Sequence, residues 1–471
     1  MADEAVALIR DVELYEHVER QFASTFHCRL RFASCAESAL ALLREQRVPT
    51  LLVDSRASQC DAATQSLVEQ LLAGDAGVPA IDVLTVGDND YPRAIAAPLW
   101  LLALEHLPMV GNAVRWETVA ERLSMVLAAR RARPLPARKH IEAGGIHLTT
   151  YCQDFFPTID DLLRVAHRDV TLLLIGETGT GKTTLARLVH NRSPRRERTF
   201  QHLACGALPA DLIESELFGH TRGAFTGAER NKIGRFQAAG QGTLLLDEID
   251  VLDLKQQVKL LRVIETGEYE LVGSTETRVS EARLIVASNV ELEDMTERAE
   301  FRSDLYYRLN VLEFRLPALR DRQLDIAPLA LQFVDECSRE HGVAVESVSR
   351  DFLAALGQYR WPGNLRELKN HMRRAVLFSQ DHRLSREDLS PKVLNPAVST
   401  ERVAFGGPLR PAGATIAEQI AQSERDVLQN ALAAHGQNRT RTAEALGLSR
   451  VGLYKKLKRL GLMSSVSSMD G

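Results

Sequence analysis

The feature that most constrains this chain is a strand–loop–helix segment, "TLLLIGETGTGKTTLARLVH", at residues 171–190. An apolar run leads into Gly176-x-x-x-x-Gly181-Lys182-Thr183, and a helical pattern follows. This is the phosphate-loop pattern in the context that it requires. Its glycines let backbone N–H groups turn toward phosphate oxygens, and the helix N-terminus adds positive potential. The segment therefore predicts an α/β domain that binds a nucleoside triphosphate.

Each position of this loop has an expected task. Lys182 is expected to reach the β- and γ-phosphates, and Thr183 to bind Mg²⁺. ATP and Mg²⁺ are therefore the expected cofactors. The plain alternative is a glycine turn between a strand and a helix. The expected cofactor-binding residues are Gly176, Glu177, Thr178, Gly179, Thr180, Gly181, Lys182 and Thr183.

A second apolar run, "GTLLLDEID" at 242–250, ends in Asp247-Glu248. Asp247 fits a carboxylate that binds Mg²⁺ together with Thr183, and Glu248 fits a general base that polarises the attacking water. An apolar strand followed by two acids is common by itself. In a chain that also carries a phosphate loop upstream, the pattern favours a catalytic role for the two acids.

Composition indicates an ordinary soluble protein, with 45% hydrophobic and 25% charged residues and a net charge of -4. The six cysteines are scattered without a CxxC pair, so neither a disulfide framework nor a zinc pattern is expected. The N-terminus is acidic with a short apolar run, unlike a signal peptide. No uncharged stretch is long enough to span a bilayer. A cytoplasmic location is the simplest expectation.

The length of 471 residues suggests about three domains. Residues 1–130 alternate apolar runs with amphipathic segments, which predicts a parallel sheet covered by helices. A basic, proline-bearing linker is expected at 131–146, an α/β ATPase domain at 147–390, and a second linker at 391–418. The remainder, 419–464, is expected to be all-α.

The hexamer "GAFTGA", at residues 223–228, lies between charged flanks. A phenylalanine in a glycine-bearing loop can swing, because glycine restricts the backbone little. Thr226 adds a hydroxyl. Such a tip can contact a partner in one nucleotide state and retract in another. The alternative is a buried turn with Phe225 as a core plug.

The segment "GQNRTRTAEALGLSRVGLYKKLKRLGL", at 436–462, predicts a helix-turn-helix. Residues 421–463 carry eight Lys/Arg and three acids, which makes a local charge of +5. The second helix of such a module enters the major groove, with its flanks near phosphates. Arg450, Lys455 and Lys456 are the expected DNA contacts. The alternative is a basic solvated helix.

Several of these motifs together resemble a known family. "GETGTGKT", "ESELFGHTRGAFTGA", "GTLLLDEID", "FRSDLYYRLNV" and "WPGNLRELKN" follow in the order seen in sigma-54-dependent transcriptional activators, the bacterial enhancer-binding proteins of the NtrC type. The resemblance covers roughly 160–380 and the C-terminal helices. It implies a receiver-like N-terminal domain, an AAA+ P-loop ATPase domain with a helical lid, and a Fis-type helix-turn-helix domain.

The resemblance also implies further roles. Asn289 matches a sensor of the γ-phosphate, and Arg366 a second sensor on the lid. Arg302 and Arg308 match arginines that reach the neighbouring subunit's site in a hexameric-type ring, although they could be plain surface arginines. The loop residues implied to contact sigma-54 are Gly223, Ala224, Phe225, Thr226, Gly227 and Ala228.

The chain departs from the family pattern at three places. Members often have Glu where this chain has Thr183. They usually have an Asn immediately before the cysteine of "CGAL", and that Asn restrains the catalytic Glu, whereas this chain has Ala204. An alanine methyl cannot hydrogen-bond a carboxylate, so the restraint is absent or supplied elsewhere. The usual Gly-x-Ser opening before the phosphate loop is also missing.

The function that these observations predict is an ATP-dependent transcription activator. It binds an upstream DNA site through a paired helix-turn-helix module, assembles a ring, and remodels sigma-54 RNA polymerase holoenzyme to open promoters. Two alternatives are a ring ATPase that remodels another protein and a DNA-binding co-regulator with a degenerate ATPase. The basic C-terminus opposes the first, and the intact Lys182 and Asp247-Glu248 oppose the second.

The N-terminal domain is expected to be a degenerate receiver. Asp54 and Thr85 fit the aspartate and the hydroxyl that a working receiver needs. The first strand, however, exits as "LIRDVE", so Arg10 is expected in one acidic place beside Asp11. Leu107 stands where the family pattern has a lysine. We therefore expect a domain that signals by binding a regulatory protein or by packing against the ATPase, without phosphorylation.

Overall fold

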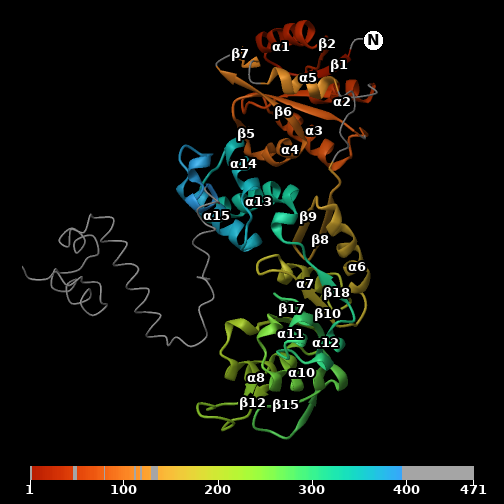
Figure 1. Ribbon diagram of the computed structural model, residues 1–471, viewed down its shortest axis with the longest axis vertical. Helices are drawn as coiled ribbons and strands as arrows, with labels where there is room; N and C mark the ends of the chain where they lie inside the picture. Colours follow the sequence, from red (N-terminus) through yellow and green to blue (C-terminus); the bar gives the residue numbers. More distant parts are fainter. Residues whose placement is uncertain are drawn as a thin grey trace, which may run out of the picture. The chain divides into compact units, whose positions relative to one another are not determined.

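The computed structural model describes residues 3–45, 50–78, 80–110, 113–116, 119–128 and 136–394 (Figure 1). The chain divides into two compact units, Met1–Pro396 and Ala397–Gly471. The expected helix-turn-helix, with Arg450, Lys455 and Lys456, lies outside the described residues, as does the second linker beyond residue 394.

The N-terminal sheet has six strands in the order β2-β1-β3-β4-β6-β7, and all pairs except β6–β7 are parallel. Its strands are β1 Asp3–Leu8, β2 Cys28–Phe32, β3 Thr50–Asp54, β4 Asp82–Gly87, β6 Ala103–Val110 and β7 Ala113–Val114. The helices are α1 Val12–Thr25, α2 Ala36–Glu45, α3 Ala62–Ala73, α4 Ala96–Leu102 and α5 Ala120–Ala128. The receiver-like order expected from the sequence is present.

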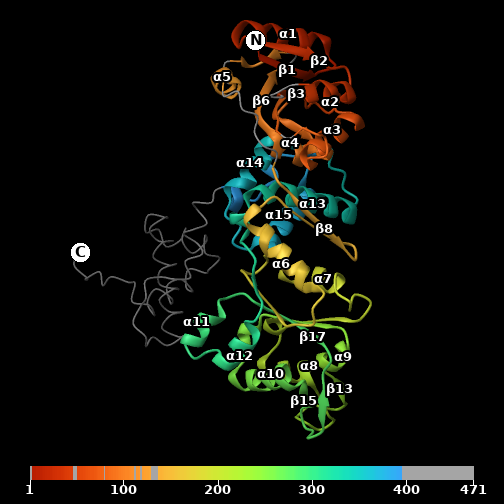
Figure 2. The ribbon, with the colours of Figure 1, turned by 90° about the vertical axis from the view of Figure 1, so that its right-hand side faces the viewer.

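Alternating side chains of this sheet enter two different cores, as the two-residue period of a strand requires. Ala5 and Ala7 pack with α1 and α5, whereas Val6 and Leu8 pack with α2, α3 and α4. Figure 2 shows these two sets of helices on opposite faces of the sheet. Both faces are buried, which is why the strands read as continuous apolar runs.

The ATPase sheet has five parallel strands in the order β11-β14-β17-β10-β18. They are β10 Leu172–Ile175, β11 Phe200–Ala204, β14 Thr243–Asp247, β17 Arg283–Ser288 and β18 Glu313–Arg315. One face packs on α6 Phe156–Ala166 and α7 Lys182–Asn191. The other packs on α8 Ala210–Phe218, α9 Arg235–Ala239, α10 Leu254–Thr266, α11 Leu292–Glu297 and α12 Ser303–Leu309.

Part of the segment expected to be a linker is regular structure. Within 131–146, residues from Lys139 onward form β8 Lys139–Ala143, which pairs antiparallel with β9 Ile146–Thr150. Ile141 and Ala143 are buried in the same core as α6 and α7. The hairpin therefore belongs to the ATPase. The basic and proline-rich composition of 130–138 concealed the alternating pattern that starts just after it.

The lid consists of α13 Gln323–His341, α14 Arg350–Gln358, α15 Asn364–Phe378 and α16 Pro391–Leu394. It shares one hydrophobic core with α2, α3 and α4 of the N-terminal domain. A small sheet also crosses between the two, because β5 Asp90–Pro92 pairs antiparallel with the lid strand β19 Ser347–Ser349, which in turn pairs with β20 Arg383–Leu384. Packing against the ATPase was one of the two expected modes of signalling, but no pattern in the sequence predicted this pairing of strands.

Two further hairpins extend from the ATPase, β12 Gly219–His220 with β13 Lys232–Ile233, and β15 Glu268–Glu270 with β16 Thr277–Val279. Among the described residues, none of the helices combines the length and the apolar character that crossing a membrane takes.

Candidate functional site

The phosphate loop joins β10 to α7, as the sequence predicts. Gly179 and Gly181 have φ of 82° and 105°, a region in which a side chain is strained. A Cβ on Gly179 would also lie 2.4 Å from the carbonyl oxygen of Gly363. Glycine is therefore needed here both for the turn and for the close approach of the lid.

Lys182 and Asn289 meet at the centre of this loop. Lys182 is 5% exposed, and its ammonium donates to Asn289 Oδ1 at 2.7 Å and to the carbonyls of Gly176 and Glu177. Burial lowers the pKa of Lys182, and the nearby carboxylates of Asp247 and Glu248 oppose that shift. The lysine charge is thus held at the loop by carbonyls that an incoming phosphate can replace.

Thr183 and Asp247 present two oxygen ligands side by side, because the Thr183 hydroxyl donates to Asp247 Oδ2 at 3.1 Å. Burial raises the pKa of Asp247, but the adjacent His202 ring, the hydrogen bond from Thr183 and the charge of Lys182 outweigh it, so the net shift is downward. His202 Nε2 lies 3.6 Å from Asp247 Oδ2. Sequence reasoning missed His202, which sits on β11 beside β14. The ionised carboxylate and the hydroxyl fit the hard-oxygen preference of Mg²⁺.

Glu248 begins a sharp turn directly after β14, with φ 58° and ψ 51°. Its side chain lies against Gly206, where a Cβ would come within 1.8 Å of Glu248 Oε2. Within the described chain, no side chain hydrogen-bonds the Glu248 carboxylate. Ala204, paired with Asp247 in the sheet, offers only a methyl group. The polar restraint that the family asparagine supplies is therefore missing at this position.

The lid is bonded directly to the phosphate loop. The buried Asn364 amide donates to Glu177 Oε2 and to the carbonyl of Thr178, both at 3.1 Å. Arg320 forms a two-pronged ion pair with Glu177, at 2.6 and 2.9 Å. This ion pair, with the Asn364 bond, lowers the pKa of Glu177. Sequence reasoning missed Asn364 and Arg320, although "WPGN" supplied a signal for the former.

A cleft of about 510 Å³ opens over the loop. Lys182, Thr183, Asp247, Glu248 and Asn289 line one part of it. The lid contributes Arg366, which places the predicted second sensor in the same cleft. The rest of the wall is mixed: it includes the apolar Ile146, Leu148, Phe155, Leu316 and Phe333 together with polar residues such as Arg322 and Glu336. The cleft thus offers charged groups for phosphates and apolar groups for a flat base.

Arg302 and Arg308 do not line this cleft. Both lie at α12, where Arg302 pairs with Asp304 at 2.6 Å and Arg308 is exposed. Two large apolar side chains beside them, Tyr307 and Val311, are 74% and 66% exposed. The structure thus puts the two arginines on an outer surface with apolar character.

The hexamer 223–228 forms the tip of the β12–β13 hairpin. Phe225 is 38% exposed, and its ring centroid lies 4.9 Å from that of His220 in an edge-to-face arrangement, while Thr226 is exposed. Gly223 and Gly227 have φ of 83° and 99°, and no neighbouring atom would contact a Cβ at either. The ring therefore lies on the hairpin surface rather than in the core.

A second loop, whose contact with the tip was not predicted from the sequence, packs against it. Thr221 bonds the carbonyls of Val272 and Gly273 in the β15–β16 hairpin, and Gly273 packs against Ala224. A Cβ on Gly273 would lie 2.6 Å from that of Ala224. The two loops lie side by side at one end of the ATPase (Figures 1 and 2).

Arg56 contacts the two acidic residues, Asp54 and Asp11, of the receiver-like site in the N-terminal domain. Its guanidinium bonds both carboxylate oxygens of Asp54, with Nη2 at 2.6 Å from Oδ2, and reaches Asp11 at 3.1 Å. Asp54 is 2% exposed. These bonds, above all those to Asp54, raise the pKa of Arg56. An internal cation thus occupies the place where a receiver would bind Mg²⁺.

Arg10, expected in one acidic place beside Asp11, pairs with Asp61 at 2.6 Å and lowers the pKa of Asp61 to about 2. The guanidinium that contacts Asp54 and Asp11 is that of Arg56. Thr85 is fully buried and bonds His106 at 2.9 Å. Leu107 faces the core.

Comparison with known families gives three matches along the chain. Residues 149–315 match the sigma-54 interaction domain, 320–404 match the AAA+ ATPase lid domain, and 419–460 match the bacterial regulatory protein, Fis family. The third match falls on the segment outside the described structure that the sequence predicts to be a helix-turn-helix.

Among curated proteins, the chain is 36% identical to the C4-dicarboxylate transport transcriptional regulatory protein DctD of Rhizobium meliloti, over 92% of this chain and 88% of DctD. It is 34% identical to the transcriptional regulatory protein ZraR of Salmonella typhimurium, over 91% and 92%. It is 42% identical to the hydrogenase transcriptional regulatory protein HoxA of Cupriavidus necator, over 64% of this chain and 62% of HoxA.

Among solved structures, NtrX from Brucella abortus in complex with ADP matches with a TM-score of 0.50 at 23% identity, over 98% of this chain and all of that one. This similarity supports the fold described above.

Proposed function

The chain belongs to the family of sigma-54-dependent transcriptional regulators, and on that premise we propose that it is an ATP-driven activator of sigma-54 promoters. It binds DNA upstream of a promoter and uses ATP hydrolysis to remodel the polymerase holoenzyme. The observation that carries this proposal is the convergence of Lys182, Thr183, Asp247, Glu248 and Asn289 in one cleft.

The chemistry follows from the placement of these side chains. Thr183 and Asp247 would hold Mg²⁺, which neutralises charge on the transferred phosphoryl group when bound. Lys182 and Asn289 would bind the γ-phosphate. Glu248 would orient the attacking water and accept its proton. Because none of the described side chains hydrogen-bonds the Glu248 carboxylate, we expect this side chain to move without breaking such a bond when nucleotide arrives.

We propose that the surface of α12 forms the contact between neighbouring subunits of a ring. Arg302 and Arg308 are outside the cleft of their own subunit, and the exposed Tyr307 and Val311 give that surface an apolar patch. A neighbouring subunit seated there would receive a guanidinium at its γ-phosphate, where such a charge stabilises the transition state. The Asp304 partner of Arg302 would then be exchanged for phosphate.

The output contact is proposed to be the tip 223–228. It offers an exposed ring and a hydroxyl on a loop with two glycines, and its residues do not line the nucleotide cleft. Arg450, Lys455 and Lys456 are proposed to contact DNA, and the Fis-type match to 419–460 supports a paired module. The expected domain bounds 147–390 and 419–464 serve as working limits for these two activities.

The N-terminal domain is proposed to act through the lid rather than through phosphorylation. Asn89 bonds Asp351 at 2.7 Å, Arg383 bonds Asp90, and Arg93 pairs with Asp335. These contacts join the domain to the element that carries Arg366. Packing on the ATPase, one of the two expected modes, is the one that these contacts support. A regulatory protein would act by changing that packing.

The direct test reconstitutes activation with the purified full chain, sigma-54 holoenzyme and promoter DNA. We expect heparin-resistant open complexes with ATP and none with a non-hydrolysable analogue. A steady-state hydrolysis assay separates the alternatives. A chain that binds DNA but hydrolyses no ATP would be the degenerate co-regulator, and hydrolysis without open complexes would indicate remodelling of another protein.

A further inference from the structure

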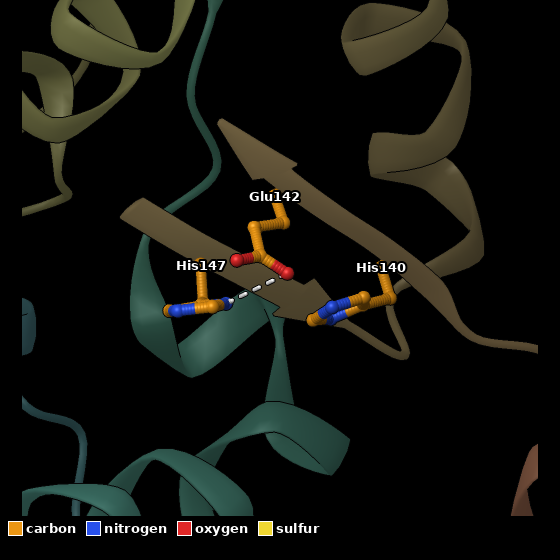
Figure 3. Close-up of side chains that lie close together, drawn as sticks. All are labelled: His140, Glu142 and His147. Atoms are coloured by element: carbon orange, nitrogen blue, oxygen red, sulfur yellow. Dashed lines mark ion pairs between the residues drawn. The ribbon is translucent and has the colours of Figure 1, made fainter. Parts of the chain in front are cut away.

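The β8–β9 hairpin places three possible metal ligands on one face (Figure 3). His140 and Glu142 are two residues apart on β8 and so share a face, and His147 lies directly opposite Glu142 on β9. All three are exposed, and one ligand atom from each lies within 4.8 Å of the other two. His147 also lines the nucleotide cleft, but the ATP chemistry proposed above assigns no role to any of the three side chains.

The position of this hairpin is fixed both by its turn and by contacts with the rest of the ATPase domain. Its two-residue loop, Gly144-Gly145, has φ of 57° and 74°, the conformation that matches the twist of paired strands and fixes their register. The opposite face is anchored because Ile141 is buried in the ATPase core. Arg192, which follows α7, donates to the Glu142 carbonyl at 2.7 Å. The three side chains therefore extend from a rigid base.

We propose that His140, Glu142 and His147 form a binding site for a divalent transition-metal ion of the zinc class. Two imidazoles and one carboxylate suit Zn²⁺, whereas Mg²⁺ and Ca²⁺ prefer oxygen ligands. A tetrahedral ion with bonds of about 2.0–2.1 Å holds its ligand atoms about 3.3 Å apart. His147 Nδ1 and Glu142 Oε2 are already 3.7 Å apart, so small side-chain rotations close the site and leave one position for water.

A supporting hydrogen bond already orients one ligand. His140 Nδ1 and the Thr149 hydroxyl are 2.7 Å apart, which leaves Nε2 of His140 for the metal. Metal-bound histidines in proteins usually have such a partner on the second nitrogen, and it fixes the ring orientation. Thr149 lies on the same hairpin face, directly opposite His140. Its role is to position His140 rather than to bind the ion.

The test titrates the full chain with Co²⁺ and Zn²⁺ alone, without nucleotide, because nucleotide phosphates bind metals themselves. Visible absorption of tetrahedral Co²⁺ and calorimetry with Zn²⁺ report the site. We expect His140→Ala/His147→Ala to abolish this binding event, and Thr149→Val to weaken it roughly 10- to 100-fold, as loss of a supporting partner does. His167→Ala, another exposed histidine, is the matched control and should bind normally.

Two results would overturn the proposal. One is a Zn²⁺ isotherm for the double variant equal to that of the wild type, which would place any binding at other side chains. The other is octahedral Co²⁺ absorption that Glu142→Gln leaves unchanged. Because the three side chains are exposed, the variants should keep the wild-type unfolding midpoint, and this is measured alongside. ATP hydrolysis is not a readout, so failure here leaves the proposed function untouched.

Discussion

Arg56 donates to both carboxylate oxygens of Asp54, with Nη2 at 2.6 Å from Oδ2 and Nε at 3.0 Å from Oδ1. The same guanidinium reaches Asp11 at 3.1 Å. Two acids that could bind a metal in a receiver are therefore neutralised by a residue of the chain itself. Phosphorylation would have to break this network before Mg²⁺ could enter.

We predict that Asp54→Ala leaves ATP hydrolysis and promoter output unchanged, and that acetyl phosphate forms no phosphoprotein. The physical reason is that Arg56 already supplies the positive charge at this carboxylate. The measurement is phosphoryl incorporation beside open-complex yield. Arg56→Ala should instead destabilise the domain by about 3–5 kcal/mol, because it leaves Asp54 buried and unpaired. A stable adduct that requires Asp54 and alters output would refute this account.

Two substitutions test the catalytic position of Glu248. Glu248→Gln should keep ATP binding and abolish turnover, because an amide cannot accept the proton. Gly206→Ala should lower turnover at least about tenfold, since its Cβ would displace Glu248 Oε2, 1.8 Å away. Gly357→Ala is the control, because no atom lies within 4 Å of its Cβ.

The measurement is the steady-state rate together with the dissociation constant of a fluorescent ATP analogue. Equal rates for Gly206→Ala and Gly357→Ala would show that Glu248 acts elsewhere. Wild-type turnover in Glu248→Gln would remove that residue from its role.

The contacts between the N-terminal domain and the lid predict a change in activity when they are weakened. The double variant Arg93→Ala/Arg383→Ala removes two ion pairs to the opposite partner without touching the core. We expect faster exchange of the backbone amides at Arg350 and at position 93, which donate across this interface to the carbonyls of Asn89 and Glu346, and a higher basal ATPase rate. Exchange and rate both equal to those of the wild type would contradict the lid-restraint proposal.

His106 makes this same region sensitive to acid. Burial lowers the pKa of His106 to about 3, and the charge of Arg350 on the lid adds to the shift. Because the unfolded chain, with a histidine pKa of about 6.5, takes up a proton first, the free energy of unfolding falls as pH drops from 6.5 toward 3. The slope contributed by His106 is at most about 1.4 kcal/mol per pH unit.

Urea unfolding at pH 4.5, 5.5 and 6.5 measures this slope. His106→Asn keeps a polar group near Thr85 but does not titrate, so its slope should be smaller than that of the wild type. An identical dependence on pH in the two proteins would show that His106 is accessible to protons in the folded state.

The sequence predicted the parts of the site that lie within one local motif. The phosphate loop, Asp247-Glu248 and the 223–228 tip each depend on neighbouring residues, so short patterns reveal them. The sequence did not reveal the side chains whose partners depend on how the chain folds. These are Arg56, His202 and Arg320, and no spacing of residues indicates which carboxylate each of them contacts. Arg56 follows Asp54 by only two residues, yet nothing in "VDSRAS" shows that the side chain folds back.

The parts of the fold that were predicted are likewise those with a local sequence pattern. Strands buried on both faces were predicted because their apolar runs are continuous. The β8–β9 hairpin was missed because one of its faces is polar, and its strand β8, with His140, was interpreted as part of a basic linker. The β5–β19 pairing was missed because each strand has only three residues, and it forms between segments more than 250 positions apart.

The most direct test of the central claim separates hydrolysis from output at the loop tip. Phe225→Ala and Thr226→Ala are compared with the wild type for ATPase rate and for open-complex yield with sigma-54 holoenzyme. We predict near-normal hydrolysis in both variants, because the tip lies outside the nucleotide cleft, together with loss of open complexes. Normal open-complex formation in both variants would contradict it.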